Sequence, residues 1–153
     1  MIDLKVSMGP CPACCGVLTP VTEEKEVRVG RRSALVRDHF GRCADCGEAF
    51  YAPGQMDATL RRATEAIRQQ EGLLSSEAVR EIREKLGLTQ QAFEKLLGVG
   101  PKTVVRWERG TVFQNRSTDS LLRVIDANPE SARFLARLHG VTLRGDQPGV
   151  AVP

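Results

Sequence analysis

The chain has 153 residues and a net charge of +3, and none of its apolar runs approaches the eighteen or so residues that a membrane span requires. This length allows one domain or two small ones, and the N-terminus lacks the apolar core of a secretory signal, so we expect a cytoplasmic protein with no membrane partner. The sequence has only two histidines and shows no Ser/His/Asp set, phosphate loop or plausible carboxylate pair, so we do not expect an enzyme.

Two Cys-x-x-Cys pairs, Cys11 with Cys14 and Cys43 with Cys46, occupy the first third of the chain. Four thiolates from two such turns are the ligand set of closed, tetrahedral structural zinc, and they leave no coordination position for a reactive water. We therefore predict one structural Zn²⁺ per chain. Iron, as in rubredoxin-like electron carriers, and a redox dithiol remain alternative interpretations of the same pattern.

Two nearby residues complicate the choice of metal ligands. Glycine usually follows the second cysteine of such a turn, yet here Gly16 follows Cys15 rather than Cys14. We favour Cys14 because its two-residue spacer matches the second pair, which leaves Cys15 as a spare thiol beside the metal. His39 lies four residues before Cys43, and we interpret it as a strand surface or packing residue.

The segment between the cysteine pairs is predicted to form a β-hairpin. Apolar and charged residues partly alternate over 18–29 and 33–40, and Gly30-Arg31-Arg32 separates the two runs. Residues 1–54 therefore read as a zinc-ribbon-like domain. Apolar residues at helical spacing then predict an amphipathic helix over about 55–70, within a connector of residues 55–74.

The second half reads as a series of short helices. The first covers 77–86, Thr89 caps the second, Gly98-Val99-Gly100 forms a tight turn, and Pro101 opens a third helix that contains Val104 and Trp107. Short helices joined by a glycine turn indicate a helix-turn-helix, with an ordinary helical bundle as the alternative. The predicted fold class is α+β: the zinc-ribbon-like domain followed by an all-α domain of about five helices over residues 75–143.

The third helix carries residues suited to reading DNA. If Val104 and Trp107 face inward, then the outward residues combine cations, a hydroxyl and one apolar contact, as base-edge recognition requires; they are Lys102, Thr103, Val105 and Arg106. Gln90 and Arg109 are placed for phosphates. Residues 1–74 have no net charge whereas residues 75–153 carry +3, so we expect only the second half to bind nucleic acid.

Two further helices are predicted before a poorly ordered tail at 144–153. Ser117 is expected to cap one of them and Pro129 to open the other. Together they carry more apolar surface than a domain of this size must bury, so part of it is predicted to form a two-fold homodimer seam. The seam residues are Leu121, Leu122, Ile125, Phe134 and Leu138, and a palindromic double-stranded DNA site would match this symmetry.

The sequence resembles two known families at different levels. Residues 86–110, which open with L-G-L-T-Q and close with W-E-R-G, closely resemble the lambda-repressor-like (Xre-type) helix-turn-helix. In chain order come the first cysteine motif, G-R-R-S-A-L-V, the second cysteine motif, the connecting helix, the Xre module and S-T-D-S-L-L-R-V-I-D-A-N-P-E. This layout, from about Cys11 to Leu138, resembles the MqsA (YgiT-type zinc finger) antitoxin family.

These resemblances imply roles for particular residues. The Xre resemblance implies a buried ion pair between Arg83 and Glu108. In the MqsA-type family the zinc ligands match the four cysteines named above, and a base-reading arginine matches Arg106. Lys102 departs from the asparagine usual at its position. A connector arginine of that family can touch DNA, which suggests Arg68.

The family resemblance also implies a function. In the MqsA-type family, the zinc domain binds an mRNA-cleaving toxin, while the helix-turn-helix domain dimerises and represses the operon that encodes the antitoxin. We therefore expect a sequence-specific repressor and antitoxin with a ribonuclease toxin as partner, and the alternative is a stand-alone zinc-ribbon/Xre-type regulator. If the toxin is basic, then Glu23, Glu24 and Glu26 are natural docking points.

Overall fold

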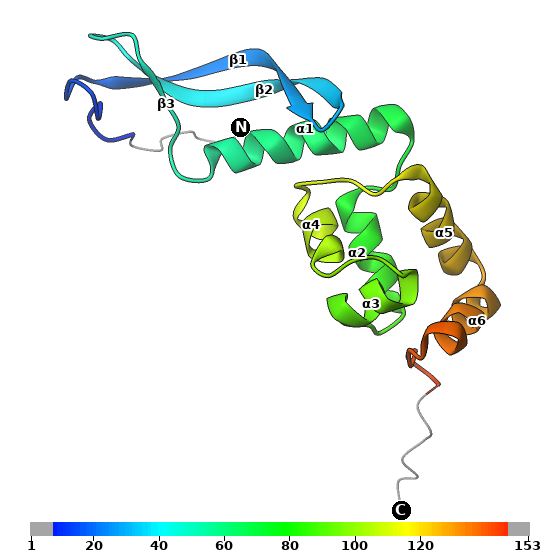
Figure 1. Ribbon diagram of the computed structural model, residues 1–153. Coiled ribbons are helices and arrows are strands. Elements are labelled where there is room, and N and C mark those ends of the chain that lie inside the picture. Colours follow the sequence, from blue (N-terminus) through cyan, green and yellow to red (C-terminus); the bar gives the residue numbers. More distant parts are fainter. Residues whose placement is uncertain (1–7, 147–153) are drawn as a thin grey trace, which may run out of the picture. The chain divides into compact units, whose positions relative to one another are not determined.

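The computed structural model of the protein describes residues 8–146. These residues form a three-stranded antiparallel sheet followed by six helices, which confirms the predicted α+β class (Figure 1). The chain divides into two compact units between Ala66 and Ile67. We call residues 8–66 unit 1 and residues 67–146 unit 2. No helix in the described residues is long and apolar enough to cross a membrane.

Unit 1 is built on the predicted hairpin. Strand β1 (Leu18–Val29) pairs antiparallel with β2 (Arg32–Cys43), in a register that runs from Leu18 opposite Cys43 to Val29 opposite Arg32. Gly30 turns the chain with a φ of +63°, a conformation that glycine adopts without steric cost. The two-residue strand β3 (Ala49–Phe50), too short to show a sequence pattern, adds to the other edge of β2.

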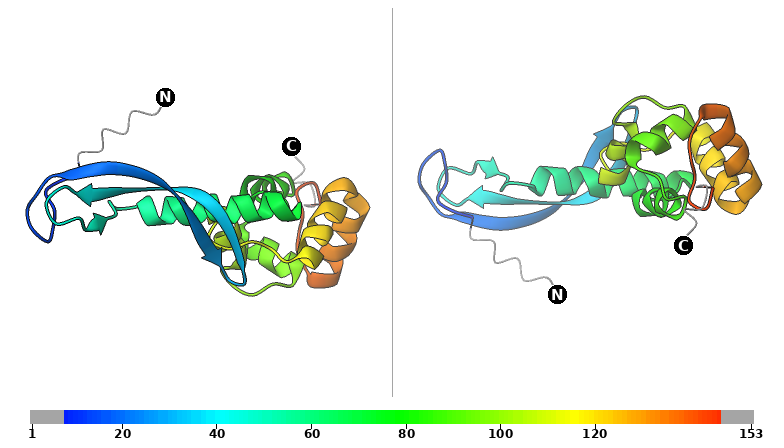
Figure 2. Two further views of the ribbon diagram at one scale, coloured as in Figure 1. Left: turned by 90° about the horizontal axis from the view of Figure 1, so that it is seen from above. Right: turned by 90° about the horizontal axis from the view of Figure 1, so that it is seen from below.

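A buried carboxylate links the sheet of unit 1 to helix α1 (Gln55–Glu71), which runs alongside the hairpin (Figure 2). Asp38 of β2 accepts hydrogen bonds from the Tyr51 hydroxyl at 2.5 Å and from the Thr59 hydroxyl of α1 at 2.8 Å, with Lys25 Nζ 3.5 Å away. Burial alone would raise the pKa of Asp38, but these donors outweigh it and lower the pKa. The carboxylate is therefore stabilised in its charged form, where it joins β1, β2 and α1.

Unit 2 contains the last turn of α1 and five further helices: α2 (Ser76–Lys85), α3 (Gln90–Leu97), α4 (Thr103–Arg109), α5 (Arg116–Ala127) and α6 (Pro129–His139). Side chains of Ser75, Thr89, Asn115 and Asn128 cap four of these helices by accepting backbone N–H bonds. Their apolar faces share one core, which includes Val79, Ile82, Phe93, Leu96, Val104, Trp107, Leu122 and Ile125.

Three local predictions about unit 2 need correction. Pro101 does not open a helix, because Lys102 adopts a left-handed φ of +61° and α4 begins only at Thr103. Asn115, two residues before the predicted Ser117, caps α5. A poorly ordered tail was predicted from Arg144, but the start of this segment is ordered, because the Arg144 amide donates to the Leu86 carbonyl at 2.9 Å. Residues 147–153 lie outside the described range.

Candidate metal centre and nucleic-acid interface

The four predicted metal ligands come together at one end of the hairpin. The Sγ atoms of Cys11, Cys14, Cys43 and Cys46 all lie within 4.8 Å of one another. Cys11 is 3.7 Å from Cys46 and Cys14 is 3.4 Å from Cys43, measured between sulfurs. Four sulfurs at about 2.3 Å from a zinc ion form a tetrahedron with edges of about 3.8 Å, so this donor set fits structural zinc with only small movements.

The two cysteine turns have the same backbone hydrogen bonds. In the first, the Cys15 amide donates to the Cys11 carbonyl at 2.8 Å; in the second, the Gly47 amide donates to the Cys43 carbonyl at 3.0 Å. Cys15 and Gly47 both have positive φ, +63° and +74°. Cys15 therefore occupies the position of the left-handed turn residue and is exposed, which explains why it is absent from the sulfur cluster.

Gly16 allows the first turn to approach the second. A Cβ atom added at Gly16 would lie 2.9 Å from Cys43 Sγ and would collide with the Asp45 carboxylate. The glycine after Cys15, which complicated the sequence interpretation, is thus required by packing against the second turn. Cys14 and Cys15 therefore correspond to Cys46 and Gly47 of the second turn: the first residue of each pair belongs to the sulfur cluster, and the second has the left-handed backbone.

Backbone amides prepare the cluster for a cation. The N–H groups of Cys46 and, more weakly, Asp45 lower the pKa of the Cys43 thiol to about 7, against the effect of burial. The Gly16 N–H also lowers the pKa of Cys14, but hydrogen bonding with Cys43 and burial outweigh it and raise that pKa to about 12. Crowded sulfurs share protons, so a cation is needed to hold all four as thiolates.

His39 does not belong to the metal centre. Its Nδ1 lies 2.8 Å from the Thr22 hydroxyl across the β1–β2 ladder, as a strand packing residue would. Among the described residues, the only group of three or more His, Cys, Asp or Glu side chains placed to bind a metal is the four-cysteine cluster. The zinc site is therefore made entirely of sulfur.

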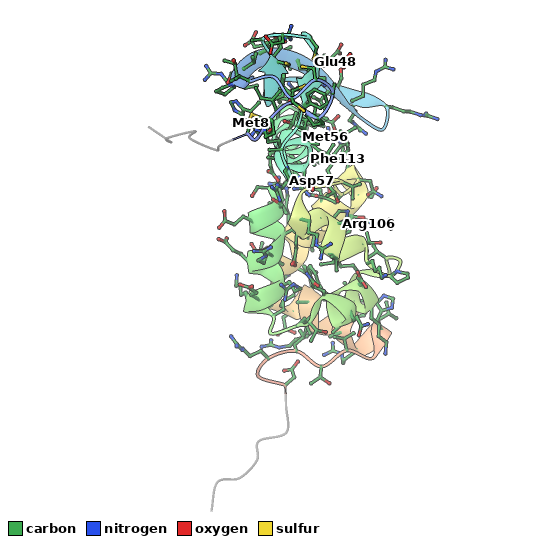
Figure 3. All side chains as sticks on the ribbon, turned by 90° about the vertical axis from the view of Figure 1, so that its left-hand side faces the viewer. Met8, Glu48, Met56, Asp57, Arg106 and Phe113 are labelled. Atoms are coloured by element: carbon green, nitrogen blue, oxygen red, sulfur yellow. The ribbon has the colours of Figure 1, made fainter. Side chains whose placement is uncertain are left out.

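Helix α4 presents the residues that were predicted to read DNA. Val104 and Trp107 are buried in the core of unit 2, whereas Arg106 and Arg109 are exposed and Thr103 and Val105 are half-buried. Arg106 lies at the surface of unit 2 (Figure 3). Lys102 is exposed at the N-terminal end of α4, where its left-handed backbone separates it from the helix.

A partly buried ion pair supports α4 from the side. Arg83 of α2 donates to both carboxylate oxygens of Glu108, from Nε at 2.5 Å and from Nη2 at 3.2 Å. The Gln90 amide donates to the same carboxylate at 2.8 Å, so this residue, predicted to contact phosphate, also supports the pair. Burial raises the pKa of Glu108, but hydrogen bonds from Arg83 and Gln90 outweigh it, and the pKa is lowered.

Two buried charged side chains that the sequence did not reveal also contact α4. Glu94 of α3, 6% exposed, accepts the Val104 amide at 3.1 Å. Arg68 of α1, 1% exposed, donates to the Trp107 carbonyl at 3.1 Å. An arginine buried inside unit 2 is not free to contact DNA, so the role suggested for Arg68 is corrected.

The residues predicted for the dimer seam divide between core and surface. Leu122 and Ile125 are buried within unit 2, at 0% and 2% exposure, because they belong to its shared apolar core. Phe134 and Leu138 are more than 60% exposed, and Val124, which was not predicted, is 51% exposed. A groove of about 390 Å³ on α5 and α6 is lined by Leu121, Val124, Phe134, Leu135 and their neighbours.

The acidic residues predicted for docking are all exposed on β1. Glu23 pairs with Arg42 at 3.2 Å, and Glu26 accepts the Ser33 hydroxyl at 2.6 Å, both across the β1–β2 ladder. Nearby, Lys25, Val27, Tyr51, Met56 and Leu60 are among the residues that line a groove of about 340 Å³ between β1 and the start of α1. Met56 is labelled in Figure 3 and is 65% exposed.

Comparison with known proteins relates the whole layout to one family. A family model described as the antitoxin component of a bacterial toxin–antitoxin system, MqsA, matches residues 8–135. The chain is 31% identical to Antitoxin MqsA of Escherichia coli (strain K12) over 103 residues, which cover 66% of this chain and 78% of that protein. It is 28% identical over 65 residues to Antitoxin HigA-2 of Vibrio cholerae serotype O1 (strain ATCC 39315 / El Tor Inaba N16961), covering 42% and 62%.

Proposed function

The chain belongs to the MqsA family of antitoxin components of bacterial toxin–antitoxin systems, and from this membership we propose a division of labour between its two units. Unit 2 binds operator DNA as a homodimer and represses transcription, and unit 1 binds a ribonuclease toxin. The observation that carries the DNA-binding role is the surface of α4, where Arg106 stands exposed on a helix fixed to the core through Val104 and Trp107.

The solvent-accessible residues on and beside α4 suit different kinds of DNA contact. Arg106 has the donor geometry for a guanine edge, and Thr103 and Val105 offer a hydroxyl and an apolar contact for bases. Arg109, at the C-terminal end of the helix, and Gln90, at the start of α3, suit phosphate oxygens. Lys102 lies on the preceding turn and adds positive charge near the same surface.

Direct binding measurements test the DNA-reading role. Titration of the zinc-loaded chain with a duplex from upstream of its own gene, and with a shuffled duplex, measures preference for sequence. Arg106→Ala should cost about 1–3 kcal/mol on the upstream duplex and leave the shuffled duplex almost unchanged. Arg109→Ala should weaken both duplexes equally and lower the salt dependence. Equal affinities of wild type and Arg106→Ala for both duplexes would contradict the assignment.

The exposed apolar side chains of α5 and α6 support a two-fold dimer. Val124, Phe134 and Leu138 lie on neighbouring helices, and such surface is commonly covered by a partner copy. Phe134→Asp should convert the dimer into a monomer in sedimentation and weaken binding to a palindromic duplex. Leu35→Asp, at an equally exposed apolar position in unit 1, should leave the dimer intact. A wild-type monomer at micromolar concentration would exclude this seam.

Unit 1 has features of a protein-binding module rather than a DNA-binding one. Residues 1–66 contain nine basic and nine acidic residues, and four thiolates with Zn²⁺ add about −2. Val17, Leu35 and Met56 are large apolar side chains exposed on this unit. A neutral-to-acidic surface with apolar contacts suits a basic protein ligand, for which Glu23, Glu24 and Glu26 provide electrostatic steering.

A further inference from the structure

Helix α4 is too short to fix its own direction. It has seven residues, about two turns, so its orientation depends on what holds its ends and its inner face. The inner face is held by Val104, Trp107 and the Arg83–Glu108 pair. At the N-terminal end, the buried Glu94 carboxylate accepts a hydrogen bond from the Val104 amide. The positive end of the helix dipole favours the negative charge of this carboxylate.

Arg68 provides the opposite contact at the C-terminal end. Its Nη2 atom lies 3.1 Å from the Trp107 carbonyl, 3.1 Å from the Val112 carbonyl and 3.3 Å from Gln114 Oε1. A cation at the C-terminal carbonyls complements the negative end of the helix dipole. The Trp107 carbonyl also accepts the Gly110 amide at 3.1 Å, so Arg68 completes the closure of the last turn.

The other partners of Arg68 are themselves fixed. Gln114 is fully buried, and its amide donates to the Leu74 carbonyl and to Asp119 Oδ1, each at 2.9 Å. Asp119 of α5 also accepts the Leu74 amide at 2.8 Å. The guanidinium therefore belongs to a buried polar network that joins the end of α1, the loop after α4 and the start of α5. Hydrogen bonds of this kind, buried away from water, rigidify the elements that they join.

We propose that Arg68 is a positioning residue for DNA reading, which fixes the last turn of α4 and thereby the direction of the Arg106 side chain. The carbonyl that it holds belongs to Trp107, the residue that directly follows Arg106. Base recognition requires side-chain placement to within a fraction of an ångström, so loosening this turn lowers sequence preference without removing a DNA contact. This inference rests on the proposed DNA-reading function of α4.

The test compares variants of the zinc-loaded full chain on the upstream and shuffled duplexes over a series of salt concentrations. Arg68→Met removes the guanidinium but keeps a long helix-forming side chain. It should lower the ratio of specific to non-specific affinity about tenfold, within the ~5- to 150-fold that a good base contact contributes. The salt slope should stay unchanged, since a lost phosphate contact would reduce it by about 0.9. Arg61→Met, at an exposed site on the same helix, should retain the wild-type ratio.

Arg68→Lys separates positioning from general stability. Lysine retains the charge but lacks the planar fork, so it should recover part of the lost ratio while circular dichroism shows a folded chain. If Arg68→Met does not fold, then folded Arg68→Lys decides the question. A ratio of specific to non-specific affinity below that of wild type would support the proposal, and a wild-type ratio would overturn it. A wild-type ratio in folded Arg68→Met, or a salt slope reduced by about 0.9, would also overturn it.

The same measurements distinguish failure of this inference from failure of the proposed function. If Arg106→Ala loses sequence preference while Arg68→Met keeps it, then α4 reads DNA and only the positioning role of Arg68 is refuted. If the wild-type chain itself does not prefer the upstream duplex, then the DNA-reading function fails and the inference fails with it.

Discussion

Cys15 holds a backbone position that would suit glycine better. Its φ of +63° matches that of Gly47 in the second turn, and its amide makes the equivalent hydrogen bond. A left-handed conformation costs a residue with a Cβ about 1–2 kcal/mol. The side chain is exposed and lies outside the sulfur cluster, so the thiol contributes nothing to metal binding in return.

Replacing this residue separates its role from that of its neighbour. Cys15→Gly should retain one zinc per chain and stabilise unit 1 by up to about 1 kcal/mol, because relief of backbone strain is partly offset by the greater freedom of glycine in the unfolded chain. Cys14→Ser should instead lose the metal. Metal analysis and thermal unfolding check both variants, and loss of zinc from Cys15→Gly would show that the ligand assignment is wrong.

Helix α4 depends on charged contacts that respond to pH. The pKa of Glu108 is lowered in the folded chain by hydrogen bonds from Arg83 and Gln90, which outweigh burial. A depressed carboxyl pKa stabilises the fold above the unfolded value of about 4.3 and loses this contribution as the pH falls through the lower folded value. The ion pair should therefore contribute fully at neutral pH and fail only in acid.

The expected signature is a change in the pH profile of unit 2. Wild type should keep a nearly constant free energy of unfolding from pH 7 to about 5 and lose stability below about 4. Glu108→Gln should be about 1–3 kcal/mol less stable at pH 7 and show a flatter acid limb. Glu130→Gln, at an exposed carboxylate on α6, serves as the matched control. Equal profiles for all three proteins would exclude a role for the pair.

Local sequence patterns predicted much of the individual elements. Alternation and Gly30 predicted the hairpin and Thr89 the cap of α3, because each depends on neighbouring residues. The four sulfurs were predicted from the two-residue spacer within each cysteine pair, although the pairs are far apart in the sequence. Leu122 and Phe134 belong to similar amphipathic patterns, and only tertiary packing decides that Leu122 is buried in the core while Phe134 is exposed. Arg68 could not be placed from sequence, since its partners lie 39 to 46 residues away.

The division of the whole chain falls inside α1 rather than before it. We expected the zinc-ribbon-like domain to end at residue 54, but unit 1 includes α1 as far as Ala66. The reason is tertiary: Thr59 donates to the buried Asp38 carboxylate, and Ala63 is fully buried. Even with this helix, unit 1 buries few large apolar side chains, so zinc should supply much of its stability.

The single tyrosine and single tryptophan provide one probe for each unit. Tyr51 lies in unit 1 and Trp107 in unit 2. Removal of zinc by a strong chelator should abolish the dispersed NMR signals of the Tyr51 ring while the Trp107 indole signal stays in place. Unchanged Tyr51 signals in metal-free protein would show that unit 1 folds without its ion.

Neutralisation of a toxin tests the proposed division of labour most directly. The full chain and two variants are co-expressed with the product of the adjacent reading frame, and growth and co-purification are measured at equal antitoxin abundance. Wild type and Arg106→Ala should restore growth and bind the partner through unit 1, whereas Cys43→Ser should do neither. A neighbour that is harmless when expressed alone and does not co-purify would contradict the antitoxin account and leave a stand-alone regulator.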